Sequence, residues 1–298
     1  MIYMKKHIIG DIDSSMNYRK GFKAGDMSYE IVKRPLESLS DTEKEDYRKG
    51  CIFVARDGFG NPDITESDIE MHVFNSSHTI FARDSSGEIL GFSSSSLESV
   101  LDQPVVYLQG VSIAKKAQGS GIFRVIAPLT IVLEMEKEGL SEAYMAARTQ
   151  NPILFKAMVD KCGMHPRPGV AVPEDIADIG ADLARLLYEE HSDFQSSQGL
   201  VFDRDLLIQR KAYGLVRDGK EVGLCMYGDN IPYCKRDRKV NRFFDDNLDF
   251  RDGDAFIMVG KVDYGSAVRQ LEEVVERANF RLPYCDDPRI GSLPFVGM

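Results

Sequence analysis

The residues best suited to chemistry lie in a short turn between two apolar stretches. Gly119 and Gly121 flank Ser120, and Lys115 and Lys116 come just before them. Glycines let backbone N–H groups approach an anion closely, and the N-terminus of a following helix adds a partial positive charge. The turn therefore predicts a binding site for a phosphate or pyrophosphate group, although plain strand-to-helix turns use glycine as well.

Two common nucleotide-binding motifs can be tested against the letters of this turn. A Rossmann turn needs G-x-G-x-x-G, but Arg124 stands at the third glycine position. A phosphate loop of the Walker type needs G-x-x-x-x-G-K-S/T, which the sequence does not contain. These mismatches argue against both kinds of nucleotide site. The missing Rossmann glycine also argues against an enzyme that uses a nicotinamide cofactor.

The spacing around the turn resembles the acyl-CoA signature of the GNAT superfamily of N-acetyltransferases, R/Q-x-x-G-x-G/A after a hydrophobic strand. Gln118 takes the first position and Gly121 the fourth, whereas Phe123 stands where the family usually has Gly or Ala. Further on, residues 148–152 (RTQNP) resemble the end of the family's fifth strand and the start of its fourth helix. The resemblance covers roughly residues 29–163 and is specific over 105–163.

The resemblance implies that acetyl-CoA is the acyl donor and that the turn and the preceding strand hold it. Residues 105–113 are apolar on both faces, as in a central strand, and Gly110 is a candidate bulge. In the family a bulge splays this strand from the next, and the pantetheine arm bonds to the backbone in the gap. The implied cofactor-binding residues are Val111, Ser112, Ile113, Gln118, Gly119, Ser120, Gly121, Ile122, Phe123 and Asn151, although Asn151 is equally suited to cap a helix.

The resemblance also implies where the catalytic groups should lie. The family often uses a carboxylate on the strand before the turn as base, and the matching position is Tyr107. Tyrosine is a poor base near neutral pH because its usual pKa is about 10, so Glu98 on the preceding segment is the substitute candidate. The family's usual acid is a tyrosine in the helix after Asn151, but Val159 stands there, which leaves Tyr144 or water.

These observations predict an N-acetyltransferase that transfers an acetyl group from acetyl-CoA to a small-molecule or peptide amine by direct attack. The missing carboxylate at Tyr107 and the missing hydroxyl at Val159 leave an alternative of a different class. That alternative is a non-catalytic sensor or scaffold domain of the same fold that binds acyl-CoA.

The elements that must position these residues can be predicted from periodicity and capping signals. Ser40 is a candidate N-cap, Asn151 and Gly163 suit the two ends of a short helix, and Ser266 suits the start of the last helix. The serine run 93–96 is interpreted as a polar sheet face or a frayed strand end. We expect helices over 42–58, 66–74, 151–163 and 173–188, one from 122 with apolar positions to 133 and one from 266, and strands over 29–33, 78–83, 88–94, 105–113, 142–149, 206–215 and 254–262.

The predicted fold is α/β and of GNAT type, with a mixed, mostly antiparallel sheet flanked by helices and a C-terminal extension. We expect a lead-in over 1–26 and an acyl-CoA-binding N-acetyltransferase core over 27–165. Residues 166–298 should complete the sheet with two strands, carry insertions at 166–205 and 216–253, and end in a helix. A separate second domain for this last part remains open.

Composition restricts the function further. The net charge of −10 and a pI near 5.1 argue against a nucleic-acid or membrane-surface partner. No apolar stretch approaches the roughly 20 residues that a membrane span needs, and no signal peptide is recognisable at the N-terminus. The cysteine number is odd and no pair has C-x-x-C spacing, which favours a reducing compartment, the cytoplasm, and no metal site. A homodimer remains open.

Two charged segments near the C-terminus were considered as sites. The acidic stretch 243–254 lacks the EF-hand spacing and is interpreted as a solvated turn. The basic cluster at 235–242 is interpreted as a solvated face, with contact to the 3′-phosphate of CoA or to an acidic partner as the minority interpretation.

Overall fold

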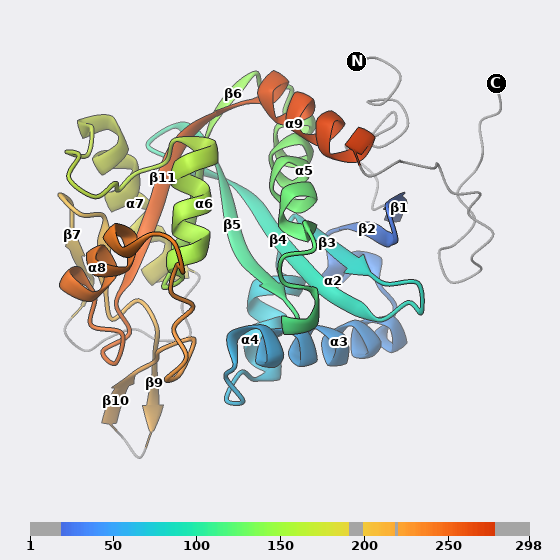
Figure 1. Ribbon diagram of the computed structural model, residues 1–298, viewed down its shortest axis with the longest axis horizontal. Helices are drawn as coiled ribbons and strands as arrows, with labels where there is room; N and C mark the ends of the chain where they lie inside the picture. Colours follow the sequence, from blue (N-terminus) through green and yellow to red (C-terminus); the bar gives the residue numbers. More distant parts are fainter. Residues whose placement is uncertain (1–18, 191–198, 218–219, 278–298) are drawn as a thin grey trace.

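One nine-stranded sheet runs through the protein, in the order β1-β2-β3-β4-β5-β6-β11-β8-β7 (Figure 1). The computed structural model describes residues 19–190, 199–217 and 220–277. All neighbouring strands are antiparallel except β5 and β6, which are parallel. The predicted fold class, a mixed and mostly antiparallel sheet flanked by helices, is therefore confirmed. The strands are β1 (Arg19–Ala24), β2 (Met27–Lys33), β3 (His78–Arg83), β4 (Ile89–Val100), β5 (Gln103–Ile113), β6 (Glu142–Thr149), β7 (Val201–Asp203), β8 (Ile208–Arg210) and β11 (Ala255–Asp263).

Helices cover both faces of the sheet, and the side chains alternate between them as the strand pleat requires. Val106, Leu108 and Met145 pack beneath α5, α6, α8 and α9, whereas Val105 and Tyr107 pack beneath α7. Helices α3 and α4 cover the same face as α7, over β2, β3 and β4. The helical segments are α2 (Pro35–Ser38), α3 (Asp41–Phe59), α4 (Glu66–Ile69), the π-helical turn η1 (Glu70–Phe74), the 3₁₀ turn η2 (Lys115–Ala117), α5 (Ile122–Lys137), α6 (Pro152–Cys162), α7 (Glu174–Glu190), α8 (Arg238–Asn247) and α9 (Tyr264–Arg277). No helix among them is long and apolar enough to cross a membrane.

Local signals placed most helices correctly. Ser40 and Glu43 form a capping box at the start of α3, each side chain bonding the other's backbone N–H. The side chain of Asn151 caps α6, and Gly163 ends that helix at a φ of 64°. The last helix begins two residues before the predicted Ser266, because the carboxylate of Asp263 accepts the Ser266 N–H at 2.7 Å.

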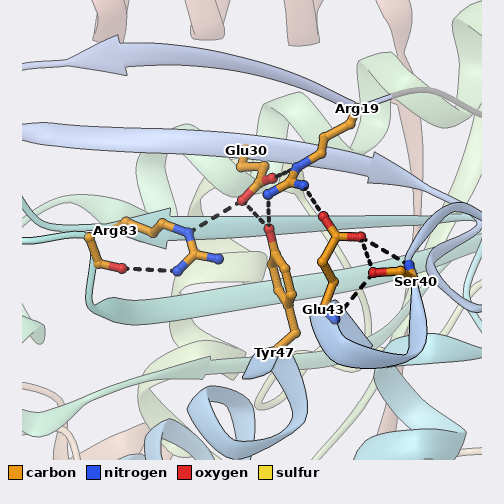
Figure 2. A network of polar contacts seen from close by, with 7 residues as sticks. Arg19, Glu30, Ser40, Glu43, Tyr47 and Arg83 are labelled. Carbon is orange, nitrogen blue, oxygen red and sulfur yellow. Dashed lines mark hydrogen bonds and ion pairs between the residues drawn. The ribbon is translucent and has the colours of Figure 1, made fainter. Parts of the chain in front are cut away.

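The first described strand lies inside the stretch that the sequence analysis treated as a lead-in. β1 pairs with β2 along its whole length, and a network of polar side chains fixes it to the sheet (Figure 2). The buried carboxylate of Glu30 accepts hydrogen bonds from Arg19, from Tyr47 Oη at 2.6 Å and from Arg83 Nε at 3.3 Å. Arg19 also reaches Glu43 on α3 at 2.7 Å. The mostly polar residues of this strand hid it, although its partner β2 follows after a two-residue turn.

The serine run forms part of the core and is not a frayed end. Ser93, Ser94 and Ser95 are buried in the middle of β4. Ser95 Oγ donates to Glu134 Oε1 on α5 at 2.7 Å, and His78 Nδ1 lies 3.0 Å from the same oxygen. A buried hydroxyl needs a partner, and the polar side chains of α5 and β3 supply one.

The predicted strand over 206–215 is broken in the structure. β8 joins the main sheet through its register with β11, while β9 (Gly214–Arg217) forms a separate hairpin with β10 (Lys220–Gly223). Leu207 and Lys211 have φ values of 52° and 50°. Such left-handed conformations interrupt an extended chain. The other predicted strand of this part is confirmed as β11, which pairs antiparallel with β6 and so continues the sheet.

Candidate functional site

The two parallel strands of the sheet separate halfway along their length. β5 and β6 pair from Val105 with Tyr144 to Leu108 with Ala147, and beyond this point β5 continues to pair only with β4. The β4–β5 register also shifts there, because Ser94 faces Gly110 while Ser95 faces Leu108. Gln109 is thus the extra residue of a β-bulge, next to the predicted Gly110. Past the bulge, no described strand pairs with the facing edges of β5 and β6, and strand-edge backbone groups of this kind can bond a ligand.

The opening between the two strands leads into a pocket. Its walls come from the end of α3 with α4 and η1, from β5 and β6, and from a segment of the C-terminal part. Phe59 and Tyr227 meet across it with ring centroids 5.1 Å apart. The lining residues are Ala55, Phe59, Ile64, Asp68, Ile69, His72, Val73, Phe92, Tyr107, Leu108, Gln109, Gly110, Val111, Ala147, Arg148, Thr149, Gln150, Leu154, Tyr213, Met226 and Tyr227.

The glycine turn follows the C-terminal end of β5, beyond the strand gap, and begins α5. Gly119 and Gly121 have φ values of 85° and 95°, a region that side chains disfavour. A Cβ added at either glycine would meet no atom within 4 Å, so the turn is open. Gly121 occupies the N-cap of α5 without a side-chain cap, which leaves the first N–H groups of the helix for a ligand. Gln118 Nε2 donates to Ile113 O at 3.1 Å and so ties the turn to the end of β5.

The predicted cofactor-binding residues fall into two groups. Val111 lines the pocket, whereas the turn residues 118–120 are exposed and Gly121 is half-buried at the start of α5. Three others have structural contacts: the Ser112 hydroxyl donates to Val54 O at 3.2 Å, Ile122 is buried, and Phe123 is half-buried in the first turn of α5. These residues follow one another along a single path from the pocket to the turn.

Asn151 caps a helix and joins the pocket indirectly. Its Oδ1 accepts the N–H groups of Ile153 and Leu154 at 2.9 and 3.1 Å. Its Nδ2 donates to the hydroxyl of Tyr227 at 2.8 Å. The side chain of the neighbouring Gln150 accepts Met226 N at 2.8 Å. Asn151 and Gln150 therefore hold the segment that closes one wall of the pocket.

Tyr107 is the catalytic candidate that lines the pocket, and its environment defines what it can do. The side chain is almost fully buried, and burial raises its pKa to about 12, with Arg148 opposing the shift. A tyrosine with this pKa keeps its proton at neutral pH. Its hydroxyl can donate a hydrogen bond there, but it cannot take a proton from an amine.

Glu98 is connected to the pocket but does not line it. The Ser96 hydroxyl donates to Glu98, and Gln109 Nε2 donates to Ser96 Oγ at 3.2 Å. Gln109 is a lining residue, so the carboxylate orients a pocket side chain through two hydrogen bonds.

The structure places Tyr144 away from the other candidates. It lies where β5 and β6 are still paired, and its hydroxyl donates to Asp175 on α7 at 3.2 Å. Lys261 lies over its ring at 5.5 Å. Tyr144 is not among the lining residues of the pocket.

Sequence reasoning missed several polar residues of the pocket. They are His72 on η1, Gln109 in the bulge, Arg148 near the end of β6, and Tyr213 with Tyr227 from the C-terminal part. Arg148 could have been identified from the sequence, because it is a charged residue in an apolar strand just before the Asn-Pro pair. Tyr213 and Tyr227 carried none, because only the fold brings them next to β6.

No protein-family model matches this chain, and no curated protein matches it. Solved structures of acetyltransferases are similar to it. A glucosamine N-acetyltransferase region of a fungal multi-domain β-N-acetylglucosaminidase has 15% identity and a TM-score of 0.38, covering 56% of this chain and 21% of that one. The ribosomal-protein-S18-alanine N-acetyltransferase of Escherichia coli has 14% identity and a TM-score of 0.36, covering 79% and 94%. A GNAT family N-acetyltransferase of Escherichia coli in complex with CoA has 14% identity and a TM-score of 0.35, covering 50% and 78%.

Proposed function

We propose that this protein is an acyl-CoA-dependent N-acyltransferase, with acetyl-CoA as donor and an amine as acceptor. The observation that carries the proposal is the separation of β5 from β6 at Leu108. It leaves a backbone-lined gap with an open helix N-terminus at one end and, at the other, a mainly apolar pocket with several polar side chains. A donor with an anionic pyrophosphate, an amide-rich arm and a thioester matches these three regions in order.

In this proposal the amine nitrogen attacks the thioester carbonyl carbon in the pocket. A C–N bond forms, the C–S bond breaks, and the proton that the amine loses ends on the sulfur of CoA. The N–H groups of the bulge, around Gln109 to Val111, would polarise the carbonyl oxygen. His72 is the lining residue best suited to accept the proton, because imidazole is the commonest general base in proteins.

Calorimetric titration with acetyl-CoA, followed by acetylation assays on an amine panel, tests the proposal. We expect acetyl-CoA to bind, NAD not to bind, and at least one class of small-molecule or peptide amine to be acetylated. Failure of acetyl-CoA to bind would overturn it. Binding without acetylation of any amine would instead favour a sensor, an alternative that the retained proton of Tyr107 supports.

A further inference from the structure

Arg148 is a half-buried arginine at the mouth of the strand gap, and it has no counter-ion among the described residues. Arg148 is the first residue of β6 beyond its last pair with β5, and it lines the pocket. Its Nε and Nη1 atoms are buried and have no hydrogen-bond partner in the described part of the chain. The guanidinium lies 4.5 Å from the ring centroid of Tyr213, which holds its plane. Arginine stays charged at any relevant pH, so the pocket contains a fixed positive charge.

The charged groups nearby do not neutralise it. No ion pair joins Arg148 to a carboxylate among the described residues, and its electrostatic neighbours are the phenols of Tyr107 and Tyr213. Asp68 also lines the pocket, but its carboxylate accepts the backbone N–H and hydroxyl of Thr65 at 2.7 and 2.8 Å. A partly buried positive charge that has aromatic and hydroxyl contacts but no carboxylate partner among the described residues is costly for a fold, which indicates that an anionic group from outside completes the site.

A second unused group lies next to the bulge. The Ser96 hydroxyl donates to Glu98, so it must accept from Gln109, which fixes the amide with its Nε2 toward Ser96. Gln109 Oε1 is then buried without a partner in the described residues. A carbonyl oxygen accepts the N–H of an amine, and this oxygen belongs to a lining residue of the same pocket.

We propose that Arg148 binds a substrate carboxylate and that the acceptor is an α-amino acid or a similar amine with a nearby carboxylate. Arg148 would take the carboxylate, Gln109 Oε1 would orient the amine, and the apolar wall around Phe59, Phe92 and Met226 would hold the side chain. The inference rests on the proposed function. The Arg148 guanidinium could also bind a carboxylate that is carried by the acyl group of the donor. In both cases Arg148 binds a carboxylate of a substrate.

The first arm of the test compares acceptors that differ only in the carboxylate. With acetyl-CoA as donor, leucine and phenylalanine are assayed against leucinamide and phenylalaninamide. We expect kcat/KM to favour the free acids roughly 10- to 100-fold, the contribution of a charged hydrogen-bonded pair. Arg148→Gln should abolish this preference, Arg148→Lys should retain part of it, and the exposed Arg185→Gln on α7 should leave it unchanged.

The second arm places the carboxylate on the donor. Succinyl-CoA is compared with acetyl-CoA, with leucinamide as the acceptor. A preference for succinyl-CoA that Arg148→Gln removes, without any preference among acceptors, assigns the carboxylate to the acyl group and supports the role of Arg148. No carboxylate preference in either arm, or a preference that Arg148→Gln leaves intact, overturns it.

A binding measurement separates this inference from the proposed function. N-acetyl-leucine and its methylamide are titrated into the wild-type protein and Arg148→Gln without any donor. Binding of the acid alone, lost in the variant, supports the inference even if no amine is acetylated. Equal binding of both compounds, or of neither, contradicts it. If Arg148→Gln does not fold, the wild-type protein is tested with the acid and the methylamide, and Arg148→Lys replaces the glutamine variant. Preferential binding of the acid that Arg148→Lys weakens supports the inference, and equal binding of the two compounds contradicts it.

Discussion

At the scale of single residues, the central question is which group takes the proton from the amine. The family resemblance places the base at the position of Tyr107, but the raised pKa of about 12 keeps this tyrosine protonated. Glu98 is held by Ser96 and acts on the pocket through Gln109. His72 lines the pocket directly, and its backbone lies against the bulge, since a Cβ on Gly110 would meet His72 O at 3.6 Å.

This arrangement predicts different effects for two conservative variants. His72→Gln should lower kcat by about 10²-fold, because it removes the proton acceptor, and the affinity for CoA should not change. Glu98→Gln should raise KM for the amine more than it lowers kcat, because it disturbs the orientation of Gln109. The pH–rate profile provides the check, since the rising limb should be lost only in the His72 variant. The reverse pattern would identify Glu98 as the base.

At the scale of elements, the turn that starts α5 should bind the donor's phosphates by its backbone and its dipole. Ser120 is exposed between the two left-handed glycines, so its side chain can be replaced without strain on either glycine. The Lys116 ammonium is already bound to Glu88 Oε2 at 2.6 Å. The helix N-terminus therefore contributes more to anion binding than this lysine does.

Ser120→Glu should weaken CoA binding about tenfold at low salt, because a negative side chain near a helix N-terminus competes with and repels the phosphates. Ser120→Lys is the matched control, and it should bind CoA as tightly as the wild type or more tightly. Titration calorimetry at two ionic strengths measures both variants. Equal affinities for the two variants would show that the phosphates bind elsewhere.

Helices with local capping signals could be predicted from the sequence, whereas a mostly polar strand could not. The capping box at Ser40, the Asn151 cap and the Gly121 turn are each coded within a few residues, so α3, α6 and α5 were placed correctly. β1 has a polar sequence and depends on Glu30, Glu43 and Tyr47 for its position. No local pattern reveals that dependence.

At the scale of the whole molecule, the pocket is built from segments that lie far apart in the sequence. Phe59 at the end of α3 and Tyr227 from the C-terminal part meet across it at 5.1 Å. Asn151 holds the Tyr227 hydroxyl at 2.8 Å, and burial raises the pKa of that hydroxyl. The proposed donor half of the site could be predicted from the sequence because one motif contains it. The acceptor half could not be predicted, since it is assembled from α3, η1, β6 and residues beyond 210.

Two variants of Tyr227 test whether this contact shapes the acceptor site. Tyr227→Phe keeps the ring against Phe59 and loses one hydrogen bond, so KM for the amine should change by no more than about fivefold. Tyr227→Ala removes the wall, and KM should rise by at least about tenfold with kcat less affected. Steady-state kinetics against the best amine of the panel measures both. Equal effects of the two substitutions would show that the hydrogen bond to Asn151 is what matters.

The pairing of β6 with β11 also has a consequence for biosynthesis. Residues 142–149 pair with residues 256–263, so β6 leaves the ribosome long before its partner exists. At a synthesis rate of about 5–20 residues per second, the interval lasts roughly 5–20 s. During that time β6, with Arg148 near its end, is the open edge of a half-built sheet, and an open edge pairs readily with other strands. The step most exposed to aggregation is therefore translation of the segment between β6 and β11, and slow codons there would lengthen the need for a chaperone.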